Sequence, residues 1–130
     1  MRISSHADRG RLVDAAAGRI LCDLRIVNCR LANVITGEVY PAEVSLFQQW
    51  IASVDEPGSC ALPAPAQIFD AEGAYLIPGF IDTHIHVEST MLTPSHFAEA
   101  VLPWGTTTVV TDPHEIANVL GTEGVLHMAE

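Results

Sequence analysis

The sequence predicts an α/β protein in which a short helix and a small all-β domain come before the first elements of a parallel sheet. Three observations support this fold class. Apolar residues follow a period of two from residue 23 to residue 72, the pattern changes at Ala74, and a strand–helix–strand order then fills about forty residues. We therefore divide the chain into a helical segment over 1–22, a partial β domain over 23–73 and a parallel α/β segment over 74–130.

The first two segments contain short elements with clear ends. The spacing of apolar residues predicts a helix over 6–18, with Gly18 as its C-cap. Alternation and β-branched residues predict four strands, over 24–31, 43–47, 50–54 and 67–70. Four short strands are too few to close a sandwich or a barrel alone.

The third segment predicts one βαβ unit. An apolar run from Tyr75 turns polar at alternate positions, and Thr93-Pro94 then begins a helix that ends before Gly105. Residues 106–111 are β-branched throughout, which is typical of a parallel strand buried on both faces. A further helix is expected to begin near Thr122.

Charge is distributed unevenly along the chain. The net charge is −10, all six basic residues are arginines within residues 1–30, and residues 31–130 contain thirteen acidic residues and no basic one. This excludes the basic stripe that nucleic acids require and a polybasic membrane contact. Three cysteines at irregular spacing define no disulfide framework, and no segment reads as a signal peptide or membrane span, so we expect a cytoplasmic protein.

Two histidines follow an apolar strand in the third segment. Alternation places Asp82, His84, His86 and Glu88 on one face. Two imidazoles at positions i and i+2 can chelate one divalent cation, with carboxylates supporting them. The alternative is a solvated strand face with exposed histidines.

A second polar cluster follows the next strand. Asp112, His114 and Glu115 come directly after residues 106–111, and carboxyl ends of parallel strands meet at one edge of a sheet. We therefore expect both clusters to face the same cleft. The alternative is an Asp-Pro turn followed by a helix that begins with a glutamate.

These motifs resemble a known family. Residues 78–86 (Pro-Gly-Phe-Ile-Asp-Thr-His-Ile-His) resemble the first barrel strand of the amidohydrolase superfamily. The runs His-Ile-His-Val-Glu-Ser-Thr-Met-Leu-Thr-Pro over 84–94 and Gly-Thr-Thr-Thr-Val-Val-Thr-Asp-Pro-His-Glu-Ile-Ala-Asn-Val over 105–119 are similar to the bacterial adenine deaminase family within it.

The resemblance implies a fold and a chemistry. The fold would be the N-terminal half of a β-sandwich plus the first two βα units of an incomplete (β/α)8 barrel. The activity would be hydrolysis of adenine to hypoxanthine and ammonia at a divalent metal, Mn²⁺ or Fe²⁺, that supplies hydroxide at neutral pH. His84 and His86 would be metal ligands. The candidates for proton transfer, which the sequence does not rank, are Glu88, Asp112, His114 and Glu115.

The resemblance also implies that the site is incomplete within these residues, because further ligands in this superfamily come from later strands. We expect an N-terminal piece of a homo-oligomeric enzyme, inactive by itself. The alternatives are another amidohydrolase acting on purines or cyclic amides, such as a relative of dihydroorotase or imidazolonepropionase, or a non-catalytic fragment that binds metal weakly or associates with a partner chain.

Overall fold

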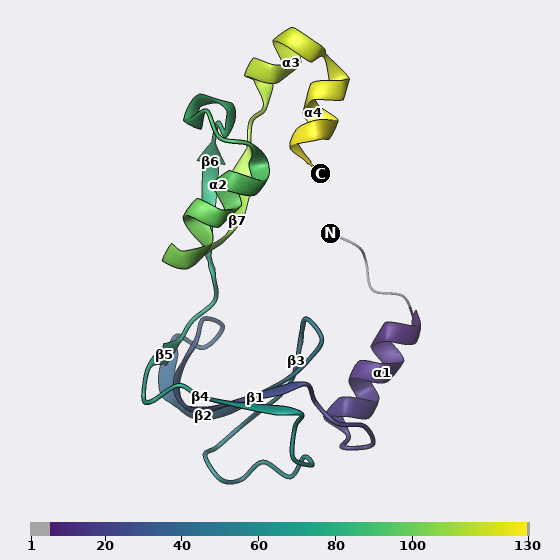
Figure 1. Ribbon diagram of the computed structural model, residues 1–130. Helices are drawn as coiled ribbons and strands as arrows, with labels where there is room; N and C mark the ends of the chain where they lie inside the picture. The colour runs from purple at the N-terminus through teal and green to yellow at the C-terminus, as the bar shows by residue number, and fades with distance from the viewer. Residues whose placement is uncertain (1–5, 130) are drawn as a thin grey trace. The chain divides into compact units, whose positions relative to one another are not determined.

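The structure is a computed structural model, and it describes residues 6–129 (Figure 1). The chain divides into two compact units, with the boundary between Pro78 and Gly79. We call them the first and the second unit. No helix among residues 6–129 is long and apolar enough to cross a membrane.

The first unit combines one helix with a five-stranded sheet (Figure 1). Its elements are α1 (His6–Ala16), β1 (Leu24–Asn33), β2 (Glu38–Phe47), β3 (Trp50–Asp55), β4 (Gln67–Asp70) and β5 (Tyr75–Leu76). The strand order is β3-β2-β1-β4, with β5 also paired to β1. β1, β2 and β3 pair antiparallel, whereas β4 and β5 run parallel to β1.

The expected elements of this unit are present, with shifted ends. α1 ends two residues before the expected position, and Gly18 then adopts a left-handed φ of 71°. β2 begins at Glu38, not at residue 43, because its hairpin with β1 continues outward until Asn33 pairs with Glu38. A turn at Gln48-Gln49 connects β2 to β3, and Gln48 has a positive φ of 54°.

Two small clusters form the core of the first unit. Ala15 of α1 packs with Cys22 and Phe47 in one cluster, and the other contains Cys29, Ala42 and Val44. Cys22 and Cys29 are free thiols, and burial raises the pKa of each. Because a thiol must ionise to act as a nucleophile or a metal ligand, these two cysteines serve packing.

The second unit is built on a pair of parallel strands, β6 (Phe80–Ile85) and β7 (Thr106–Thr111), which lie side by side in Figure 1. The other elements are η1 (Glu88–Thr90), α2 (Pro94–Val101), η2 (Leu102–Trp104), α3 (His114–Leu120) and α4 (Thr122–Met128). The strand–helix–strand order is the predicted βαβ unit. α4 begins at the expected residue, and α3 is an additional helix before it.

Local signals in this unit act as expected. The Thr93 side chain accepts a hydrogen bond from the His96 backbone N–H and caps α2, and Gly105 closes η2 with a φ of 92°. Gly79 lies so close to β7 that a Cβ at this position would be 2.1 Å from the Thr107 hydroxyl. Glycine at 79 therefore permits the close approach at which β6 begins.

One prediction for β7 is wrong. The strand was expected to be buried on both faces, but each of its side chains is half-buried or exposed, and Val110 is 53% exposed. The physical reason is that, among the described residues, β7 pairs with one strand only. A parallel strand needs neighbours on both edges and layers on both faces to be fully buried.

Candidate metal centre

The ionisable residues of both motifs meet where β6 and β7 end. His84 lies within β6, His86 follows the strand, and Glu88 opens η1. Asp112 follows β7, and the next two site residues, His114 and Glu115, open α3. The Asp112 backbone N–H donates to the Ile85 carbonyl, 3.1 Å away, so backbone pairing joins the two strand ends.

The two histidines of β6 point at one place. His84 Nε2 and His86 Nε2 are 3.2 Å apart, and their rings meet edge to face with centroids 4.8 Å apart. Two nitrogens bound at about 2.1 Å to one metal lie about 3.0–3.4 Å from each other in octahedral or tetrahedral geometry. The observed separation of 3.2 Å matches this distance between two ligand atoms.

The orientation of the His86 ring is fixed from its other side. His86 Nδ1 lies 2.9 Å from the Asp112 carbonyl oxygen, which can only accept, so Nδ1 carries the proton. Nε2 then keeps its lone pair and faces His84. A histidine held by a backbone carbonyl in this way is the usual arrangement around a metal.

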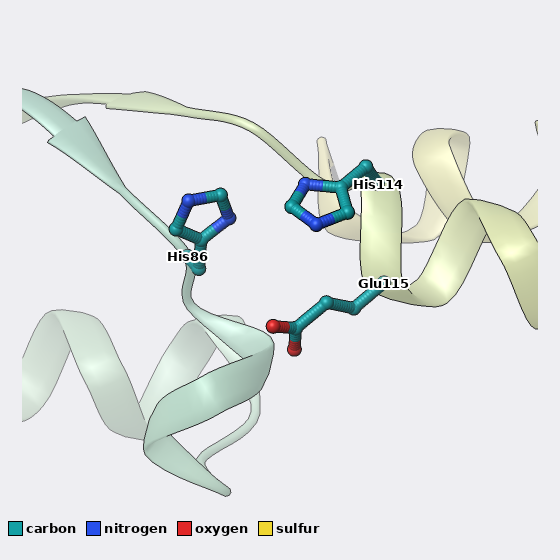
Figure 2. A group of neighbouring side chains, drawn as sticks. All are labelled: His86, His114 and Glu115. Carbon is teal, nitrogen blue, oxygen red and sulfur yellow. The ribbon is translucent and has the colours of Figure 1, made fainter.

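The residues that open α3 converge on the same place (Figure 2). The His114 ring lies 4.8 Å from the His86 ring, edge to face, and His114 Nδ1 is 3.3 Å from an Asp112 carboxylate oxygen. Glu115 accepts a hydrogen bond of 2.8 Å from the Ser89 hydroxyl. Nothing in the sequence pattern singles out Ser89, because its contact depends on how η1 and α3 meet.

Glu88 and Asp82 occupy places that strand alternation did not predict. The expected shared face for residues 82–88 is wrong beyond Ile85, because β6 ends there and Glu88 begins a 3₁₀ turn. Glu88 Oε1 accepts from the Ile116 backbone N–H at 3.4 Å, and Oε2 is buried with no hydrogen-bond partner among the described residues. Asp82 accepts from the His84 backbone N–H at 3.1 Å.

Residues 75–130, which include the whole centre, match the family model described as the amidohydrolase family. The resemblance to this family is confirmed. An adenine deaminase of Thermosipho africanus is 43% identical over 117 residues, which are 90% of this chain and 20% of that protein. Adenine deaminase 2 of Agrobacterium fabrum is 49% identical over 117 residues, which are 90% of this chain and 19% of that protein.

A solved structure supports the fold class. The L-hydantoinase (dihydropyrimidinase) from Arthrobacter aurescens aligns with a TM-score of 0.60 and 22% identity, over 72% of this chain and 21% of that one. The α/β class is thus confirmed. The chain spans about a fifth of the length of the curated relatives it matches.

Proposed function

We propose that the protein carrying this chain hydrolyses adenine to hypoxanthine and ammonia with a divalent metal. The observation that carries the proposal is the pair of His84 and His86 Nε2 atoms, which lie 3.2 Å apart while the Asp112 carbonyl holds the His86 ring. The similarity to proteins named adenine deaminase over 90% of the chain supports adenine as the substrate.

The residues present fit a divalent metal. Two imidazole nitrogens stand at ligand spacing, and carboxylates surround them with no lysine or arginine anywhere in residues 79–130 to balance their charge. Imidazole and carboxylate together suit Mn²⁺, Fe²⁺ or Zn²⁺, and we propose Mn²⁺ or Fe²⁺. When bound, such a metal lowers the pKa of water to about 7.

The chain's own residues would orient and move protons. The Asp112 carbonyl holds His86, and the Asp112 carboxylate faces His114. Loss of ammonia requires a proton on the leaving nitrogen. We propose that it comes from one of the four ionisable residues that follow β6 and β7, which are Glu88, Asp112, His114 and Glu115. Glu88 Oε2 is the oxygen of this set that is buried and unpartnered.

The finer architecture is part of the proposal. We propose that residues 1–22, 23–73 and 74–130 are the helical segment, the first half of a β-sandwich and the first two βα units of a (β/α)8 barrel. An apolar groove of about 470 Å³ on the first unit's sheet supports a second covering sheet; its lining includes Ile26, Val44, Leu46, Ile51 and Val54. A homo-oligomeric, cytoplasmic enzyme remains a prediction.

The test is a substrate panel with the full-length protein. The metal-free protein, reloaded with Mn²⁺, should convert adenine to hypoxanthine and release one ammonia per turnover. His84→Ala should lose the metal held by the His84–His86 pair, and His86→Ala should lose bound metal as well. Each variant should lose at least about 10³-fold in turnover, since a bound metal lowers the barrier by several kcal/mol. His127→Ala, an exposed histidine of α4, is the matched control.

Two results would contradict the proposal. Opening of a cyclic amide with adenine untouched would assign a different amidohydrolase activity. Full metal occupancy in the double variant of His84 and His86 would show that neither residue is a ligand.

A further inference from the structure

A second group of ligand atoms lies beside the His84–His86 pair. His86, His114 and Glu115 each present a ligand atom, and these atoms all lie within 4.8 Å of one another. Figure 2 shows the three side chains turned toward a common space, one from the end of β6 and two from the start of α3. Among residues 6–129, this group contains these three residues and does not include His84.

Each member of the group has a polar neighbour at one atom, through a hydrogen bond for His86 and Glu115 and a close carboxylate for His114. The Asp112 carbonyl holds His86 Nδ1 at 2.9 Å, and the Asp112 carboxylate lies 3.3 Å from His114 Nδ1. The Ser89 hydroxyl donates to Glu115 Oε1 at 2.8 Å. These contacts leave Nε2 of both histidines and Oε2 of Glu115 available to bind a cation. Outer contacts of this kind orient side chains that bind metals.

The charge around the group favours a cation. Residues 79–130 contain seven acidic side chains and no lysine or arginine: Asp82, Glu88, Glu99, Asp112, Glu115, Glu123 and Glu130. Two of them lie close to His114: an Asp112 carboxylate oxygen is 3.3 Å from its Nδ1, and Glu115 belongs to the same group of ligand atoms. The basic residues all precede residue 31. A divalent cation is the simplest counter-charge for such a site.

We propose that His86, His114 and Glu115 ligate a divalent cation, so that the start of α3 supplies metal ligands and not proton transfer alone. Two imidazoles and one carboxylate form a three-donor site with an open position, suited to Zn²⁺, Mn²⁺ or Fe²⁺. Donor atoms around one such cation lie at most about 4.3 Å apart, so closure needs side-chain shifts of only several tenths of an ångström.

The proposal rests on the proposed function only through His86, whose Nε2 also faces His84. An imidazole nitrogen binds one metal, so His86 completes either this group or the His84 pair. The loss of His84 should therefore leave a cation on the group at α3.

The test is Mn²⁺ binding to the metal-free full-length protein, with free Mn²⁺ measured by electron paramagnetic resonance. Glu115→Gln and His114→Asn should each weaken Mn²⁺ binding at this site by more than about 100-fold, because a ligand is removed. Ser89→Ala should weaken it by about tenfold, because Glu115 remains but loses the hydrogen bond that orients it. Glu123→Gln and His127→Asn, both exposed in α4, should bind as wild type.

Folding is checked separately. Glu115→Gln keeps the side-chain volume and its hydrogen bond with Ser89, so its circular dichroism should match wild type. Mn²⁺ should raise the melting temperature of wild type, since a cation that binds the folded state stabilises it, and should raise that of Glu115→Gln less. This shift would not differ if Glu115 had a purely structural role.

The outcomes separate this site from the proposed function. Mn²⁺ retained in His84→Ala but lost on adding Glu115→Gln supports the site. Wild-type Mn²⁺ binding in both Glu115→Gln and His114→Asn overturns it, whatever the activity. Adenine turnover is recorded in parallel: a wild-type protein that binds Mn²⁺ through this group but leaves adenine intact supports the site and contradicts the proposed function.

Discussion

Among the described residues, six of the eight buried hydrophobic side chains lie before Pro78, whereas Val87 and Phe97 are the two that lie after it. The candidate metal ligands are distributed in the opposite way. The His and carboxylate cluster lies wholly in the second unit, and His84, His114 and Glu115 are exposed. The first unit therefore buries most of the apolar side chains, and the second unit carries the exposed candidate ligands.

The difference shows what each unit depends on. The first unit contains two buried apolar clusters, so apolar burial contributes most of its stability. The second unit has a two-stranded sheet, and isolated two-stranded pairings are marginal in water. Its order comes from backbone pairing, helix caps and close packing at glycine, and the proposed cation would add to these.

The largest expected effect on stability comes from a substitution in the buried core of the first unit. Phe47 is 3% exposed, and the Arg11 guanidinium lies 5.2 Å from its ring centroid. Phe47→Ala should lower the free energy of unfolding by about 3–5 kcal/mol, because the cavity cannot close fully. Val39→Ala, at an exposed position of β2 outside the apolar groove, is the control for urea unfolding. Equal midpoints for the two variants would show that this core contributes little.

A smaller effect on stability is expected at Gly79, where the backbone lies close to the Thr107 side chain of β7. Gly79→Ala places a Cβ against the Thr107 side chain and should cost about 1–3 kcal/mol, as overpacking does. Gly10→Ala is the matched control, since nothing lies within 4 Å of that position in α1. Hydrogen exchange of the β6 and β7 amides measures the change. Slower exchange in Gly79→Ala than in wild type would contradict the argument.

The smallest expected effect concerns a helix cap. Thr93 accepts from the His96 backbone N–H at the start of α2. Thr93→Ala should destabilise the second unit by about 1 kcal/mol, and Thr93→Ser should restore most of that loss because it keeps the hydroxyl. Thermal unfolding of the three proteins checks the order. A Thr93→Ser variant as unstable as Thr93→Ala would indicate that the lost methyl matters, not the cap.

Local signals in the sequence predicted local structure well. Thr93-Pro94 begins α2, and Gly105 ends the turn after it, because caps depend on neighbours within one helical turn. The start of β2 was missed because pairing with β1 sets it. The same reasoning covers the interior of β7, whose burial depends on neighbouring elements and not on its own β-branched residues.

The site was predicted in part for the same reason. Parallel strands end at one edge, which is enough to bring His86 near His114. The place of Glu88 was missed because the alternation of β6 stops at Ile85. The contact between Ser89 and Glu115 joins residues 26 positions apart, and no local pattern encodes which hydroxyl meets which carboxylate.

The hydrogen bond between the His86 ring and the Asp112 carbonyl also spans only 26 positions. Contacts of short sequence separation close early, because little chain entropy is lost in forming them. We therefore expect the donor atoms to meet during biogenesis before more distant parts of the chain pair. A cation captured at that moment would act as a folding template for β6 and β7, so metal supply during synthesis would govern the yield of folded protein and not only its later turnover.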